Sequence, residues 1–168
     1  MPNADTSPTP SPHAYTVADR ERLEILKKYH TIAMVGLSPN PYRPSYFAAI
    51  YLQRAGYRII PVNPAAAEIL GERSYPDVLS IPEPVDVVDV FRRVEEVPAI
   101  ADQAIAKGAK VLWLQFGIVH EEAAAKARAA GLQVVMDRCM KVEHARFFGN
   151  LNLVGLNSGV ISAKRRFP

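Results

Sequence analysis

The stretch Thr31–Pro64, TIAMVGLSPNPYRPSYFAAIYLQRAGYRIIPVNP, decides the fold of this chain. An apolar strand ends at Gly36, and a loop rich in Ser, Pro, Asn and Arg follows it. An amphipathic segment then leads through a glycine turn to a second apolar strand. This is the order of the opening β-α-β unit of a doubly wound nucleotide-binding fold. The loop is not G-x-G-x-x-G, however, and the second strand ends in Asn63-Pro64 where an NAD site usually has Asp or Glu. The stretch therefore predicts a nucleotide ligand and argues against a standard NAD site.

The same alternation of strand, helix and glycine continues along the chain. The predicted helices cover 19–29, 45–55, 97–107 and 120–130, the predicted strands cover 31–36, 57–62, 85–91, 110–116 and 132–136, and a mixed connection covers 69–81. In the helix 45–55, the spacing of Phe47, Ile50 and Tyr51 predicts one packed side. With right-handed crossovers, these elements predict an α/β, Rossmann-like, doubly wound five-stranded parallel sheet with helices on both faces. We expect the strand order 3-2-1-4-5.

Length and composition predict one ordered domain in a chain of 168 residues. We expect residues 1–16 to be a disordered Pro/Ser-rich tail, 17–147 to be the domain and 148–168 to be a C-terminal extension. The start lacks the basic and apolar regions of a signal peptide, and no apolar run is long enough to cross a membrane. The single cysteine, Cys139, fits a reducing compartment. These features predict a cytoplasmic protein without a membrane partner, and the net charge of +3 does not by itself predict nucleic-acid binding.

Candidate functional residues follow from the expected sheet, because ligands of open parallel sheets bind beyond the carboxyl ends of the strands. Those ends, taken in chain order, contribute Gly36, Leu37, Ser38, Asn40 and Arg43; Asn63 and Pro64; Phe91, Arg92 and Arg93; Gln115, Phe116 and Gly117; and Asp137, Arg138 and Cys139. Four arginines thus lie on one rim, beside backbone donors and a helix N-terminus. This combination favours an anion, most simply a phosphate group.

The loop 36–45 is the strongest part of this candidate site. Gly36 permits a sharp turn and leaves room for a phosphate, while three prolines stiffen the loop. Ser45 is a candidate cap for the following helix, whose positive end would point at the ligand. The alternative is a rigid structural turn in which Arg43 is simply solvated.

Several motifs in order resemble the small stand-alone CoA-binding proteins, the YccU-like CoA-binding domain family. They are G-L-S-x-N-P-x-R-P-S, L-Q-x-A-G-Y-R-I-I-P-V-N-P, ILGERSYPDV, IPEPVDVVDVFRR, GAKVLWLQFG and VMDRCMKVEHAR, and they run from about residue 31 to residue 146. The same fold forms the CoA-binding domain of succinyl-CoA synthetase α subunits. The resemblance implies coenzyme A or an acyl-CoA as the ligand.

It also implies roles for individual residues. The diphosphate would be held by Ser38, Arg43 and backbone amides of the loop, and Asn63-Pro64 would lie along the adenosine. Ala65–Ala67 stand where related synthetase domains often carry Gly and Lys, so the 3′-phosphate would fall to Arg43, Arg73 or Arg92.

The resemblance also implies a path for the pantetheine arm of CoA, which would extend from the nucleotide along the sheet edge. Phe91 and Arg92 would flank the nucleotide or the start of the arm, and Gln115 and Gly117 would line a channel toward Arg138 and Cys139. Together, the predicted binding residues are Gly36, Ser38, Asn40, Arg43, Ser45, Asn63, Pro64, Phe91, Arg92, Gln115, Gly117 and Arg138. The histidine spacing predicts no metal site, and we predict no catalytic residue.

Three functions stay open at this point. The first is non-catalytic binding of CoA or acyl-CoA, with a homodimer or another protein partner left open. The second is a small NAD(P)-binding redox or sensor domain, in which Arg43 or Arg92 reads a 2′-phosphate. The third is a CoA-dependent enzyme, or a synthetase-like subunit that needs a partner, using a cluster over 137–144. We expect that this cluster cannot converge on one point, that Arg138 pairs with Asp137 or Glu143, and that Cys139 is a buried thiol rather than a partner of the CoA thiol.

Overall fold

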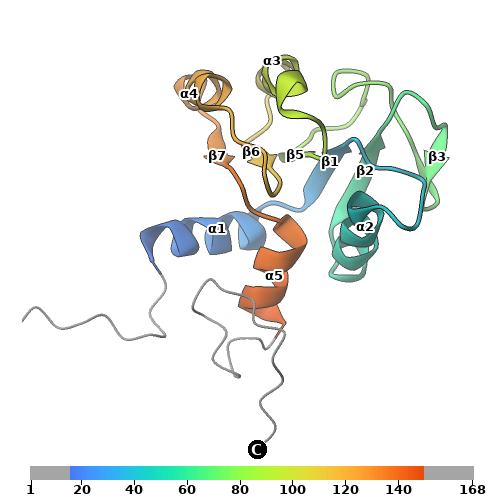
Figure 1. Ribbon diagram of the computed structural model, residues 1–168, viewed down its shortest axis with the longest axis horizontal. Coiled ribbons are helices and arrows are strands. Elements are labelled where there is room, and N and C mark those ends of the chain that lie inside the picture. The colour runs from blue at the N-terminus through green and yellow to red at the C-terminus, as the bar shows by residue number, and fades with distance from the viewer. Residues whose placement is uncertain (1–15, 150–168) are drawn as a thin grey trace, which may run out of the picture.

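Five short parallel strands form the central sheet of the computed structural model, in the order β2-β1-β5-β6-β7 (Figure 1). The structure describes residues 16–149. The strands are β1 (Thr31–Val35), β2 (Arg58–Val62), β5 (Val87–Val90), β6 (Val111–Leu114) and β7 (Gln133–Val135). The three inner strands are almost wholly buried, as expected of parallel strands that are covered on both faces. The predicted α/β Rossmann-like fold is confirmed.

Helices cover both faces of this sheet (Figure 1). They are α1 (Val17–Lys28), α2 (Pro44–Arg54), α3 (Val97–Lys107), α4 (Glu121–Ala129) and α5 (Met140–Phe148), and a short 3₁₀ turn, η1 (Val94–Glu96), precedes α3. Residues of α3 and α4 pack with Val88 and Leu112 in one apolar core. Residues of α1, α2 and α5 pack with Met34 and Trp113 in the other. Each face of the sheet therefore has its own core.

The observed strand order corrects the predicted order 3-2-1-4-5. Counted along the sheet strands alone, the order is 2-1-3-4-5, because β5 pairs with β1 rather than lying beyond β2. The connection from β2 to β5 carries the small antiparallel hairpin β3 (Glu68–Ile69) and β4 (Glu72–Arg73), and its Val78 and Ile81 pack on the α3/α4 face. Both orders obey the right-handed crossover rule, so the rule alone cannot choose between them. The strand order reverses between β1 and β5, which places the loop after Gly36 beside Phe91.

The predicted domain limits can be compared with the structure only near the two ends of the described residues, 16–149. The predicted tail and C-terminal extension fall almost entirely outside the described residues. Thr16 is described, and it caps α1: its hydroxyl accepts a hydrogen bond from the Asp19 amide, while the Asp19 carboxylate accepts one from the Thr16 amide. Within residues 16–149, no helix combines the length and apolarity that crossing a membrane requires.

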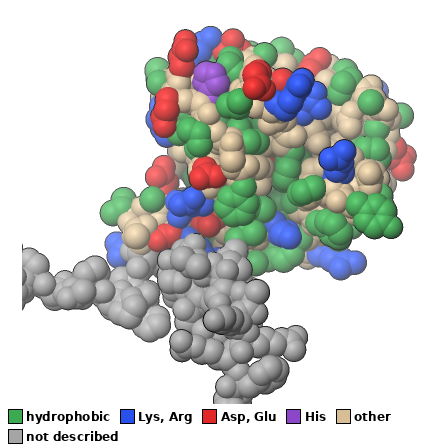
Figure 2. Space-filling view, viewed as in Figure 1, with side chains coloured by type: hydrophobic (Ala, Val, Ile, Leu, Met, Phe, Trp, Pro, Cys, Tyr) green, Lys and Arg blue, Asp and Glu red, His purple; other side chains and the backbone are tan. Residues whose placement is uncertain are grey.

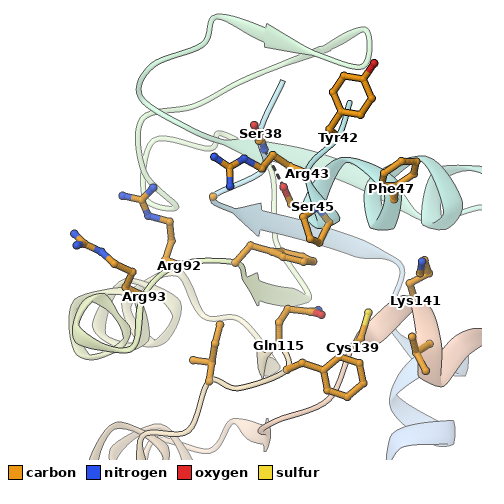
Figure 3. Close-up of a pocket in the computed structure, with 16 residues that line it drawn as sticks. Ser38, Tyr42, Arg43, Ser45, Phe47, Arg92, Arg93, Gln115, Cys139 and Lys141 are labelled. Carbon is orange, nitrogen blue, oxygen red and sulfur yellow. Dashed lines mark hydrogen bonds between the residues drawn. The ribbon is translucent and has the colours of Figure 1, made fainter. Parts of the chain in front are cut away.

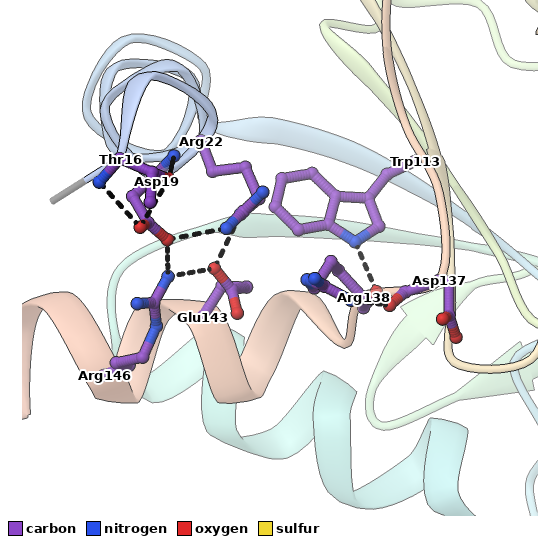
Figure 4. Close-up of polar contacts among 8 residues, drawn as sticks. All are labelled: Thr16, Asp19, Arg22, Trp113, Asp137, Arg138, Glu143 and Arg146. Carbon is purple, nitrogen blue, oxygen red and sulfur yellow. Dashed lines mark hydrogen bonds and ion pairs between the residues drawn. The ribbon is translucent and has the colours of Figure 1, made fainter. Parts of the chain in front are cut away.

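A buried cluster of charges joins the first and last described helices (Figure 4). Arg146 on α5 donates to Asp19 of α1 at 2.5 Å and to Glu143 at 2.7 Å, and Arg22 contacts both carboxylates at 2.7 Å. Burial alone would raise the pKa of Asp19, but hydrogen bonds from Thr16 and Arg146 hold it well below its usual range. The cluster fixes α5, and with it the wall that the start of α5 contributes to the site described below.

Replacing Arg146 by methionine tests the contribution of this cluster. The Arg146→Met variant leaves Asp19 and Glu143 buried with only Arg22 between them. We expect the free energy of unfolding at pH 7 to fall by about 3 kcal/mol, as when one partner of a buried ion pair is removed. Urea denaturation followed by circular dichroism measures the change.

The matched control is Lys126→Met. Lys126 on α4 pairs with Asp102 on α3 at 2.6 Å, but both side chains are more than half exposed. An exposed pair contributes about 0–1 kcal/mol, so this variant should lose little stability. Equal losses in the two variants would contradict the importance given to the buried cluster.

Candidate functional site

A cavity of about 940 Å³ lies at the carboxyl edge of the sheet, at the point where strand order reverses (Figure 3). Its walls come from the loop after β1, the start of α2, the ends of β5 and β6, and the start of α5. It is lined by Gly36, Ser38, Tyr42, Arg43, Pro44, Ser45, Phe47, Phe91, Arg92, Arg93, Gln115, Phe116, Ile118, Cys139, Lys141 and Val142. Its volume falls within the range of about 300–1,000 Å³ typical of small-molecule sites.

Gly36 is the tightest point of this edge. Its φ of +87° is in the left-handed region, and its amide donates to the Val62 carbonyl at 2.9 Å. A Cβ atom at this position would lie 2.5 Å from the backbone oxygen of Phe91 and 2.6 Å from Cδ of Arg92. Only glycine fits, both because of the backbone conformation and because two chain segments touch here.

The loop after Gly36 is braced by its own polar groups. Ser38 donates its amide to Oγ of Ser45, Asn40 donates its amide to Oγ of Ser38, and Tyr42 donates its amide to Oδ1 of Asn40. The Arg43 amide donates to the Asn40 carbonyl, and the prolines at 39, 41 and 44 have no N–H. Most backbone donors of the loop are therefore already engaged. The resemblance implies that backbone amides of the loop hold the anion. In this structure, an anion bound here would instead rely on side-chain hydroxyls, Arg43 and the positive end of α2.

The predicted helix cap at Ser45 is wrong. The N-cap position of α2 is Arg43, without a side-chain capping bond, and Pro44 occupies the first turn. Proline suits that position because its missing N–H would have no partner within the helix. Ser45 is buried instead, and its hydroxyl tethers the loop to the helix through Ser38.

Three exposed arginines give the cavity rim its charge. Arg43 makes no ion pair within the described part of the chain, whereas Arg92 and Arg93 both contact Glu96, at 2.7 and 3.8 Å. On the face shown in Figure 2, acidic and basic side chains alternate instead of gathering by sign. Of these three arginines, Arg43 is thus the most available to an incoming anion.

A smaller cavity, of about 420 Å³, shares Gly36 and Arg92 with the first. Asn63 and Pro64 line it, together with residues of α3 such as Ile100. The Asn63 side chain bridges neighbouring segments: its amide donates to the Leu37 carbonyl and its oxygen accepts from the Ala65 amide, each at 2.9 Å. Asn63 therefore ties the end of β2 to the loop after β1.

The predicted binding residues divide between these places. Seven line the larger cavity, namely Gly36, Ser38, Arg43, Ser45, Phe91, Arg92 and Gln115, and the smaller one adds Asn63 and Pro64. Asn40, Gly117 and Arg138 line neither cavity. Asn40 braces the loop, the Gly117 amide donates to Oδ1 of Asp137, and the Arg138 guanidinium donates to the Asp137 carbonyl.

Sequence reasoning missed much of the apolar wall. Tyr42, Phe47, Ile118, Lys141 and Val142 line the larger cavity without having been predicted to do so. The helical spacing placed Phe47 on the packed side of its helix, yet its side chain is 53% exposed at the mouth of the cavity. The sequence did offer one signal for Phe47: it is an apolar residue in the first turn of the helix that follows the predicted phosphate-binding loop.

The cluster over 137–144 does not converge, as expected. Cys139 and Lys141 line the larger cavity, Glu143 belongs to the buried charge cluster, and His144 stacks among Tyr51, Tyr57 and Phe148. Arg138 contacts Asp137, as expected, but through the backbone carbonyl, whereas Glu143 pairs with Arg22 and Arg146. Burial raises the pKa of the Cys139 thiol and lowers the pKa of His144.

Comparison with known proteins identifies relatives of this chain. The sequence model of a family described as a CoA binding domain matches residues 30–145. The uncharacterized protein YneT of Bacillus subtilis is 44% identical over 122 residues, covering 73% of this chain and 90% of the relative. A hypothetical protein from Pyrococcus horikoshii OT3 has a solved structure that is 43% identical, with a TM-score of 0.75, and the match covers 83% of this chain and 97% of that one.

A larger relative shares only one region with this chain. An ADP-forming acetate–CoA ligase of Archaeoglobus fulgidus is 32% identical over 98 residues, which is 57% of this chain and 14% of the ligase.

Substituting Gly36 tests the close approach at the sheet edge. We expect Gly36→Ala to lower the free energy of unfolding by clearly more than the roughly 1 kcal/mol that a left-handed alanine alone costs, because the new Cβ meets the Phe91 carbonyl. Thermal unfolding by calorimetry measures the loss.

Gly131→Ala is the matched control. Gly131 has a similar φ of +95°, but nothing lies within 4 Å of a Cβ built there. This variant should show the backbone cost alone. If the two variants unfold at the same temperature, the contact at Gly36 does not constrain the edge as described.

Proposed function

This chain belongs to the CoA binding domain family, and from that premise we propose that it binds coenzyme A or an acyl-CoA, without catalysing a reaction, at the carboxyl edge of its sheet. The observation that carries the proposal is the arrangement at Gly36. There, two cavities meet at a backbone position with no side chain, beside the start of a helix and beside Arg43, which makes no ion pair within residues 16–149.

The ligand's diphosphate would lie at this junction. Ser38 and Ser45 have hydroxyl hydrogens to donate, Arg43 has no carboxylate partner among the described residues, and the N-terminus of α2 favours negative charge. The prolines and internal hydrogen bonds hold the loop in place before binding, so little ordering entropy is lost on association.

The two cavities suit the two ends of the ligand. The smaller one, against Asn63 and Pro64, would take the adenosine, and the larger one would take the pantetheine arm along Phe91 and Gln115. An apolar acyl group would extend toward Phe47, Phe116 and Val142. The side-chain amide of Asn63 is already engaged with the backbone, in place of the carboxylate that an NAD site would use for the ribose.

The groups that would serve a reaction support a binding role instead. The raised pKa keeps the Cys139 thiol protonated near neutral pH, which makes it a weak nucleophile. His144 hydrogen-bonds to Tyr51 within an aromatic cluster, and Glu143 is held by two arginines.

A ligand panel tests the class of nucleotide. Calorimetric unfolding would be measured with CoA, acetyl-CoA, NAD, NADP and ATP. A ligand present at 100 times its dissociation constant adds about 2.7 kcal/mol to the stability, so we expect a clear rise in the midpoint with CoA compounds. A rise with NADP alone would favour a redox or sensor domain, and no rise with any of them would contradict the proposal.

Arg43→Ala tests the phosphate contact itself. Removing one charge-assisted hydrogen bond should weaken CoA binding by about 1.5–3 kcal/mol. Isothermal titration calorimetry measures the affinity, with Arg54→Ala as the control because Arg54 is an exposed arginine at the other end of the same helix. Unchanged affinity in Arg43→Ala would show that the loop does not hold the phosphates.

A further inference from the structure

Asp89 is a buried carboxyl group that neither the fold nor the proposed function explains. It lies in the middle of β5 with no exposed surface, and its partners in register on the two neighbouring strands are Met34 and Trp113. Its Oδ1 accepts a hydrogen bond from Nε2 of Gln115 at 2.6 Å, and its Oδ2 has no partner in the described part of the chain. Burying a carboxyl group among apolar neighbours is costly, so a position like this points to a role.

Gln115 connects this carboxyl to the larger cavity. Asp89 is in register with Trp113, and Gln115 follows Trp113 by two residues, so both polar side chains point to the same face of the sheet. Gln115 lines the cavity, and Figure 3 shows its side chain pointing toward Cys139. Asp89 therefore acts on the cavity through Gln115.

The hydrogen bond fixes which end of the Gln115 amide faces the cavity. An ionised carboxylate can only accept, so Gln115 must turn its NH₂ group toward Asp89. Its carbonyl oxygen, Oε1, is left for the cavity. Without Asp89, nothing in the described contacts of Gln115 would choose between the two orientations of the amide.

We propose that Asp89 is a positioning residue that holds Gln115 with its carbonyl oxygen toward the cavity, where it accepts a hydrogen bond from an uncharged N–H donor of the ligand. This inference rests on the proposed function, in which that donor is an amide of the pantetheine arm. The nucleotide is held elsewhere, at the Gly36 junction. The Asp89–Gln115 pair thus distinguishes a ligand with an amide-bearing arm from a bare nucleotide.

Protonation of Asp89 reverses this arrangement. Burial raises the pKa of Asp89 to about 7, and the hydrogen bond from Gln115 opposes the rise. A protonated Asp89 can donate to Oε1, which turns the NH₂ group of Gln115 toward the cavity and removes the acceptor. Recognition of the arm should therefore be strong above pH 7 and weaken as the pH falls below it.

The groups that surround Asp89 come from the two neighbouring strands and from the start of α5. Met34 and Trp113, on the strands either side of Asp89, carry no charge. Just before α5, the Cys139 thiol has a pKa raised from 9.0, by burial and also by the charge of Asp89, so it stays neutral. His144 is turned away toward Tyr51 and lines neither cavity. The raised pKa of Asp89, about 7, lies within the pH range that the test covers.

Two ligands separate the arm from the nucleotide in a test. Calorimetric dissociation constants would be measured for CoA and for adenosine 3′,5′-bisphosphate, which lacks the arm, at pH 6, 7 and 8. The two ligands share the 3′-phosphate, but the 5′-phosphate monoester of the bisphosphate also titrates at about pH 6. The ratio of the two constants is therefore compared with the same ratio for Gln115→Met, in which the titration of the ligands is identical. Relative to Gln115→Met, we expect the preference of the unmodified protein for CoA to fall about fivefold from pH 8 to pH 6, the effect of one neutral hydrogen bond.

Two variants complete the test. Gln115→Met, similar in length, should weaken CoA binding about fivefold at pH 8 and leave the bisphosphate unchanged. Asp89→Asn should flatten the pH profile, because its amide does not titrate. Bisphosphate binding reports that each variant is folded, and if Asp89→Asn fails to fold, the profiles of the unmodified protein and Gln115→Met decide.

The outcomes distinguish this inference from the proposed function. If CoA binds but its preference over the bisphosphate depends on pH in the same way in the unmodified protein and in Gln115→Met, or if Gln115→Met weakens both ligands equally or neither, the role of Asp89 is overturned while CoA binding stands. If neither ligand binds the unmodified protein, the proposed function fails, and this inference fails with it.

Discussion

The contact between Gly36 and the backbone carbonyl of Phe91 is the constraint on which the rest of the site depends. It occurs where the strand order reverses between β1 and β5, and the missing side chain lets two chain segments approach within the space that a Cβ would fill. The contact sets the start of α2 and the end of β5 side by side. Both cavities open at this point, so one glycine determines where they join. Asn63 reinforces the junction by tying the end of β2 to the loop.

The loop after Gly36 illustrates how a rigid anion site can be built without free backbone amides. Prolines and side-chain hydrogen bonds use up or remove most of its N–H groups, which leaves hydroxyls and Arg43 as the donors. Rigidity of this kind extends to the opposite wall, because the charge cluster of Asp19, Glu143 and Arg146 holds α5 in place beside the cavity. Gln115 then lies between two rigidly held walls of the cavity. Because the site is rigid, a single hydrogen bond to Gln115 can discriminate between ligands.

The sequence predicts the elements and the edge that carries the site, but not how the elements are joined. Apolar runs and glycine stops are local signals, and they place each sheet strand within about two residues. The position of β5 beside β1 depends on a long non-helical connection whose path leaves no local signal. The contribution of Phe47 to the cavity and the loss of free amides depend on three-dimensional geometry. In the sequence, Asp89 is one polar residue in an apolar strand. Its pairing with Gln115 can be recognised only when the register between β5 and β6 is known.

The most direct test of the central claim is a titration of ¹⁵N-labelled protein with CoA, followed by amide chemical shifts. We expect the largest changes on the amides of residues 36–45 and 91–93, with smaller changes at 115–117, because these segments meet where the strand order reverses. Changes confined to other surfaces, with these amides unmoved at saturation, would contradict the claim that this edge of the sheet is the binding site.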